Sequence, residues 1–161
     1  MNNEEIKKFN EKKYFKLFLK ELGQSTQCKS IKNGEALKSE LDIICEFADG
    51  SIRGFELTEC MDQNARHDLE KHSYSSEDIP SGGGTGNIKR IVAQKLSKTY
   101  TPDLPIELLV YSDQLSYLNF SGAKHELLDQ GGFERGQFEK IWLMFVGEET
   151  GLIYERGVDC C

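Results

Sequence analysis

Two carboxylates interrupt a segment whose apolar pattern is typical of a buried hairpin. The segment "LDIICEFADGSIRGFELTE" covers residues 41–59, and its apolar residues predict strands near 41–48 and 51–58. The turn between them fits "ADGS", because Asp-Gly tolerates the positive φ that tight hairpins need. Asp42 opens the first strand and Glu56 lies near the end of the second. Folding the hairpin therefore brings their backbones close together.

Two acids at one place in a core predict a bound cation. Like charges make each other costly to ionise unless a cation lies between them. Together with the main-chain carbonyl of Leu57, Asp42 and Glu56 would form a set of hard oxygen ligands suited to Mg²⁺ or Mn²⁺. Such a site can activate a water and neutralise the charge that develops on a phosphodiester. The alternative is that Asp42 is a solvated strand end, and that Glu56 and Glu59 are surface acids.

A helix is predicted before the hairpin, and it carries a third acid toward the core. Residues 4–22 contain strong helix formers without Pro or Gly, and Gly23 follows where a C-terminal cap is expected. The apolar residues cover one broad side of this helix and several lysines share the other. Glu11 falls near the middle of the apolar side. An acid there costs free energy unless a cation meets it.

The remaining segments predict an α/β domain. Residues 24–40 are a polar loop, and residues 61–85 are a long loop or short helix that ends in "SGGGTG". A helix is expected over 87–100, a buried strand over 104–113, and a loop with a short helix over 121–138. A strand over 138–149 follows, with residues 151–157 as its pairing partner. This order predicts a mixed central β-sheet flanked by helices, in a single domain that spans residues 1–161.

The hairpin resembles the core of the PD-(D/E)XK nuclease-like superfamily, in a variant with Glu-x-Thr in place of Glu-x-Lys. Asp42 takes the Asp position, Leu41 stands where Pro is often seen, and Glu56 takes the acidic position. Thr58 replaces the Lys, and Glu11 is the best match for the acid of the preceding helix. The resemblance implies a restriction-endonuclease-like fold and an endonuclease that hydrolyses phosphodiester bonds of DNA with Mg²⁺ or Mn²⁺.

The threonine is the main departure from the pattern that this resemblance implies. In such enzymes the lysine positions the attacking water and offsets charge at the phosphate, and Thr58 has no charge for the second task. Lys95, in "IVAQKLSK", is our candidate for a replacement, because the helix after the hairpin packs near the site in this fold. Gln94 beside it could orient substrate or water, although adjacent helix positions do not face the same way. The alternative is that Lys95 faces solvent.

The net charge sets a second hypothesis beside the nuclease. A charge of -7 gives no overall basic field for a polyphosphate backbone, so DNA binding would need a local basic surface, metal ions or a basic partner. The same charge favours a catalytically inactive binding protein on a nuclease scaffold. Such an inhibitor, immunity factor or nucleic-acid mimic would use its acidic surface to occupy a basic protein's cleft. The sequence leaves the oligomeric state open, with a homodimer among the options.

The other candidate groups carry weaker signals. His67 and His72 are five residues apart, which is not the spacing of a helical metal pair, and Cys60 is best interpreted as a small buried residue. A small-molecule enzyme that uses Cys60 or His67 is a third hypothesis. The five cysteines lack CxxC spacing, which argues against a disulfide framework or structural zinc. Without a long apolar run or a secretory signal, we expect a cytoplasmic protein with no membrane partner.

Overall fold

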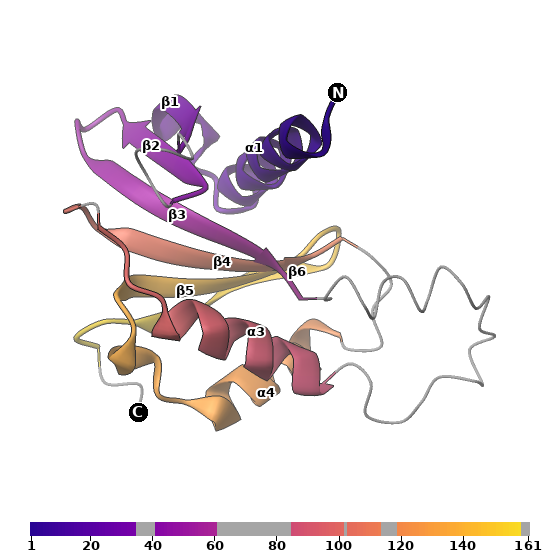
Figure 1. Ribbon diagram of the computed structural model, residues 1–161. Helices are drawn as coiled ribbons and strands as arrows, with labels where there is room; N and C mark the ends of the chain where they lie inside the picture. The colour runs from indigo at the N-terminus through magenta and orange to yellow at the C-terminus, as the bar shows by residue number, and fades with distance from the viewer. Residues whose placement is uncertain (35–40, 61–84, 102, 114–118, 159–161) are drawn as a thin grey trace.

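A six-stranded mixed β-sheet forms the centre of the chain, so the predicted α/β class is confirmed. The structure is a computed structural model, and it describes residues 1–34, 41–60, 85–101, 103–113 and 119–158. Helices cover both faces of the sheet (Figure 1). The strands are β1 (Cys28–Asn33), β2 (Ile43–Phe47), β3 (Ile52–Glu59), β4 (Ile106–Ser112), β5 (Phe138–Phe145) and β6 (Glu149–Glu155).

The strands lie in the sheet in the same order as in the chain. β1, β2 and β3 pair antiparallel, β3, β4 and β5 pair parallel, and β6 returns antiparallel to β5. The predicted hairpin is therefore β2 and β3, with Gly50 at φ 86° in its turn. The predicted pairing of the last two strands is also confirmed. β4 lies inside the sheet, and all seven of its residues are buried, as its continuous apolar run requires.

Three helices of the described chain pack on this sheet. They are α1 (Asn3–Glu21), α3 (Thr85–Ser97) and α4 (Phe120–Gln130), and two short 3₁₀ turns lie at Ser25–Gln27 and Phe133–Arg135. Asn2 and Glu5 form a capping box at the start of α1, in which each side chain bonds the other's backbone N–H. Gly23 follows α1 at φ 68°, the conformation predicted for it as a C-terminal cap. No helix within the described ranges is both long and apolar enough to cross a membrane.

Two apolar cores lie on opposite faces of the sheet, because side chains alternate along each strand. On one face, Phe15 and Phe18 of α1 pack on Phe55 of β3, with ring centroids 4.6 and 6.4 Å away. On the other face, α3 and α4 cover a core that includes Leu108 and Val110 of β4. A side chain at an odd-numbered position of β3 therefore faces α1, and one at an even-numbered position faces α3.

One strand contradicts the sequence prediction. β1 lies within residues 24–40, which were predicted as a polar loop. It is an edge strand that pairs with β2 alone, and its residues "CKSIKN" are exposed or half-buried. A strand of this kind lacks the apolar alternation that identifies strands in a sequence, because neither of its faces is deeply buried.

Candidate functional site

The hairpin brings Asp42 and Glu56 to adjacent places on neighbouring strands. Ile43 pairs with Phe55, and continuing this register by one residue sets Asp42 opposite Glu56. The Asp42 carboxylate is held in position, because its Oδ2 accepts a hydrogen bond of 2.9 Å from the backbone N–H of Leu57. The hairpin thus brings one acid from each of its arms to the same place.

Glu11 joins these two acids from α1. It is 6% exposed and Glu56 is 1% exposed, so both lie in the interior as the helical pattern predicted for Glu11. Burial, followed by the nearby charge of Asp42, raises the pKa of Glu11 to about 7. The same two causes, in the same order, raise the pKa of Glu56. Asp42 therefore acts electrostatically on both Glu11 and Glu56.

Lys95 of α3 contacts Glu56 on the face of the sheet opposite α1. Its Nζ lies 2.6 Å from Oε2 of Glu56, and its charge partly offsets the rise in the pKa of that acid. Thr58 lies two residues after Glu56 on β3 and so shares its face. The structure thus places Lys95 against Glu56, on the face of β3 where Thr58 brings no charge. Gln94, the adjacent candidate, is exposed.

A second lysine, which the sequence analysis missed, covers the acids from α1. Lys7 Nζ lies 3.3 Å from Oε1 of Glu11 and 3.7 Å from Oδ1 of Asp42. Burial alone would lower the pKa of Lys7, but the charges of Asp42, Glu11 and Glu56 outweigh it and raise that pKa. Its position four residues before Glu11 was a usable signal, because residues so spaced are neighbours on a helix.

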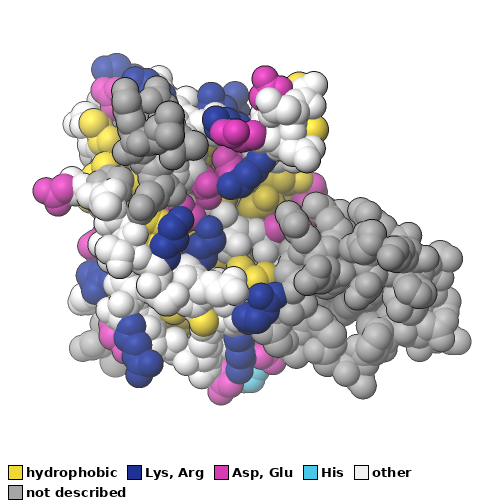
Figure 2. All heavy atoms as spheres, viewed as in Figure 1, with side chains coloured by type: hydrophobic (Ala, Val, Ile, Leu, Met, Phe, Trp, Pro, Cys, Tyr) yellow, Lys and Arg dark blue, Asp and Glu magenta, His cyan; other side chains and the backbone are white. Residues whose placement is uncertain are grey.

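Basic side chains lie around this site, although the net charge of the chain is -7. On the face seen in Figure 2, Lys and Arg side chains gather around acidic ones in the region between α1 and α3. Lys98, just after α3, also contributes, since its charge acts to lower the pKa of Glu56. Lys7, Lys95 and Lys98 therefore place positive charge around the three acids.

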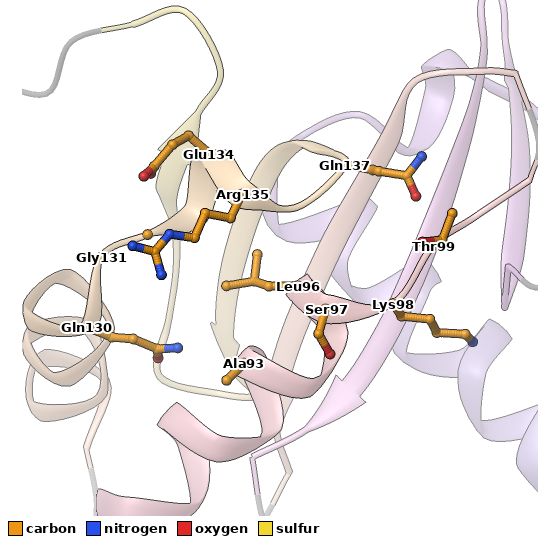
Figure 3. Close-up of a pocket in the computed structure, with 11 residues that line it drawn as sticks. Ala93, Leu96, Ser97, Lys98, Thr99, Gln130, Gly131, Glu134, Arg135 and Gln137 are labelled. Atoms are coloured by element: carbon orange, nitrogen blue, oxygen red, sulfur yellow. The ribbon is translucent and has the colours of Figure 1, made fainter.

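A groove of about 600 Å³ lies beside Lys98, where α3 and α4 end. Figure 3 shows Gln130 and Arg135 on one side of this groove, and Ser97 and Lys98 on the other. Its lining combines two cationic side chains with several hydroxyl and amide groups. The groove was not predictable from the sequence, because its residues come from segments more than 30 positions apart that meet only when the helices pack.

The donor set is compatible with a hard divalent cation. Within the described ranges, no three His, Cys, Asp or Glu side chains are placed so that they could hold a metal ion together. Mg²⁺ commonly takes only one or two carboxylates and keeps several waters. Asp42, Glu56 and the Leu57 carbonyl are ligands of the types that it uses. Lys7 and Lys95 balance the charges of Asp42 and Glu56.

Cys60, another candidate within the described residues, is not part of this group. Cys60 is buried, and burial followed by the charge of Glu59 raises the pKa of its thiol to about 12, which opposes a role as nucleophile. His67 and His72 lie outside the described residues.

A buried acid that the sequence analysis overlooked, Glu107, lies on the α1 face, where it accepts hydrogen bonds from Arg53 at 3.3 Å and Trp142 at 2.6 Å.

Comparisons with protein-family models, with curated proteins and with solved structures find no match for this chain. The resemblance to PD-(D/E)XK nucleases therefore rests on the residues quoted above.

Proposed function

We propose that this chain is a divalent-metal-dependent nuclease that hydrolyses phosphodiester bonds of DNA. The observation that carries the proposal is the meeting of four charged side chains from four separate segments. Glu11 comes from α1, Asp42 from the residue before β2, Glu56 from β3 and Lys95 from α3. Ionisable groups gathered in a partly buried place, with pKa values displaced by one another, are typical of a catalytic site.

Each of these residues has a role that its geometry supports. Asp42 and Glu56, with the Leu57 carbonyl, would hold Mg²⁺ or Mn²⁺, which when bound polarises the phosphate and lowers the pKa of a bound water. The hydrogen bond from Leu57 N–H fixes the Asp42 carboxylate through Oδ2, while its Oδ1 lies 3.7 Å from Nζ of Lys7. Glu11 would assist directly or through a water. Lys95 would offset negative charge at the phosphate, which Thr58 lacks the charge to do.

The order of elements lends further support. A helix, an antiparallel three-stranded meander, a second helix and a parallel strand follow one another as α1, β1, β2, β3, α3 and β4. The two acids of the hairpin lie where β2 begins and within the second half of β3. This arrangement is similar to what the resemblance implies for a restriction-endonuclease-like core.

The direct test is cleavage of plasmid DNA with Mg²⁺ or Mn²⁺ by the native chain and three amide variants. We expect Asp42→Asn and Glu56→Gln to lose activity by about a hundredfold or more, because each removes a metal ligand. Asp49→Asn is the matched control, since it makes the same change in the exposed turn of the same hairpin. Equal activity in all four proteins would overturn the proposal. Calorimetry with Mn²⁺ should show weaker binding to Asp42→Asn than to Asp49→Asn.

A second candidate is a binding protein on a nuclease scaffold that no longer catalyses. It is favoured by Thr58 and by the pairing of the acids with Lys7 and Lys95, which offsets the cost of burying their charge. Burial of Glu11 and Glu56 also withholds them from a basic partner, so this function would use acids elsewhere on the surface. Recovery of one stoichiometric basic partner, together with no heat of Mn²⁺ binding, would support this candidate over the first.

A further inference from the structure

Two cysteines that are well separated in the sequence lie in contact. Cys28 is in β1 and Cys45 is in β2, and their sulfur atoms are 3.2 Å apart across the antiparallel pair. A disulfide bond is about 2.05 Å long, so the sulfurs need to approach by only about 1 Å to be joined. Sequence spacing gave no sign of this pair, because the contact depends on a strand that was predicted as a loop.

The two thiols differ in their access to solvent. Cys45 is completely buried, while Cys28 is half-buried and lines a groove of about 470 Å³. Lys16 and Lys29 line the same groove, and both are exposed. A reagent can therefore reach Cys28 but not Cys45. It would do so beside Lys16 and beside Lys29, whose charge is balanced by Glu46 at 3.1 Å.

We propose that Cys28 is a site of thiol–disulfide exchange with small acidic disulfides, and that Cys45 resolves the product into an internal disulfide. In the first step Cys28 gives its proton to solvent, and its sulfur attacks one sulfur of the small disulfide. That disulfide bond breaks, and one small thiolate leaves and takes up a proton. In the second step Cys45 loses its proton, attacks the Cys28 sulfur and releases the second small thiol. Two protein thiols are oxidised and one small disulfide is reduced.

The environment of the pair supports this order of events. Burial, followed by the hydrogen bond and charge of Cys28, raises the pKa of the Cys45 thiol to about 12. Cys45 is thus a poor nucleophile toward anything in solution, and only a sulfur held against it gives the proximity that offsets this. The charge of Lys16 in the groove favours a disulfide that carries carboxylates. The exchange uses neither Asp42 nor Glu56, so it is independent of the proposed nuclease function.

The test uses oxidised glutathione on the full chain with Cys160→Ser and Cys161→Ser, so that these two thiols cannot exchange. We expect a mass loss of about 2 Da, from the two departing hydrogens, and a peptide that links Cys28 to Cys45. Cys45→Ala should instead retain one glutathione as a mixed disulfide, and Cys28→Ala should not react. A mixed disulfide that persists with Cys45 present, or a link to Cys60, would overturn the proposal.

Two further readouts test the groove and the cross-link. Lys16→Gln should slow the reaction with oxidised glutathione several-fold but leave the reaction with neutral hydroxyethyl disulfide unchanged, whereas Lys20→Gln, outside the groove, should alter neither. Equal effects of the two lysine changes would overturn the assignment of an acidic ligand. The cross-link joins residues 17 apart, so it should lower the unfolding equilibrium constant by roughly a hundredfold. An unchanged constant would show that the joined strands are strained and would overturn the proposed geometry.

Discussion

Replacing Lys95 with methionine should destabilise the chain by an amount that depends on pH. Lys95 Nζ lies 2.6 Å from Oε2 of Glu56, whose side chain is only 1% exposed. Once Lys95 is gone, Glu56 either remains charged in the interior or takes up a proton. Breaking a buried ion pair in this way usually costs about 3–5 kcal/mol, because the remaining charge has no partner. Protonation of Glu56 costs less free energy than burying its unpaired charge, so it limits the loss of stability.

The size of this limit follows from the ordinary pKa of Glu, 4.5. Holding a proton on the acid costs about 1.4 kcal/mol for each pH unit above that value, so the loss is at most about 3 kcal/mol at pH 7 and under about 1 kcal/mol at pH 5. In the variant the folded-state pKa of Glu56 lies above its unfolded value. The folded state then binds more protons, and its stability relative to the native chain falls as pH rises above about 4.5.

Urea unfolding in metal-free buffer at about pH 5, 6 and 7 measures this loss. Lys124→Met, at an exposed position of α4, is the matched control and should show no pH-dependent loss. The double variant Lys95→Met with Glu56→Gln should recover most of the stability at pH 7, because no buried charge is left unpaired. A loss that stays constant over this range, or that is larger at pH 5 than at pH 7, would refute the reasoning.

Three further variants test other parts of the structure. The pKa of Glu11 is raised to about 7, so its ionisation should lower the stability of the native chain as pH rises from 4.5 to 7. Glu11→Gln should flatten this pH profile. In urea unfolding at pH 8 the variant should be more stable than the native chain by about 1–2 kcal/mol, a value that allows for screening by solvent. Gly54→Ala would set its Cβ 2.4 Å from Leu41 Cδ1, and a loss of about 1–3 kcal/mol in the same assay is expected; no loss would show that Leu41 moves aside freely. Trp142→Phe removes the 2.6 Å hydrogen bond to buried Glu107 and should cost about 1–3 kcal/mol, whereas a neutral result would mean that water replaces the indole.

The strands and helices that carry strong periodic patterns were predictable, and the edge strand was not. α1 consists of strong helix formers and buries Tyr14, Phe15, Phe18 and Leu19 at helical spacing, and β4 is a continuous apolar run, so each identifies itself locally. β1 is defined by its pairing with β2 and not by its own side chains. A polar edge strand cannot be distinguished from a loop until its partner strand is known, and this is also why the contact of Cys28 with Cys45 was missed.

Within the candidate site, the acids were easier to predict than the cations. Asp42 and Glu56 stand out because a carboxylate is unusual in an apolar hairpin, and Glu11 stands out for the same reason on the apolar side of α1. A lysine on a helix surface is ordinary, so Lys7 carried only the weaker signal of its position four residues before Glu11. Glu107 was missed for a different reason: its partners, Arg53 and Trp142, lie on strands on either side of β4, and only the assembled sheet shows how its charge is balanced.

The position of Lys95 shows how a cation that β3 lacks at Thr58 can reach Glu56 from α3 instead. Glu56 and Thr58 are two residues apart on β3, so both point to the face that α3 covers. A lysine at either position 58 or position 95 can therefore reach the same space, from the strand or from the helix above it. What the buried carboxylate requires is a cation within hydrogen-bond distance, and this requirement constrains the place of the charge in the fold more tightly than its place in the sequence.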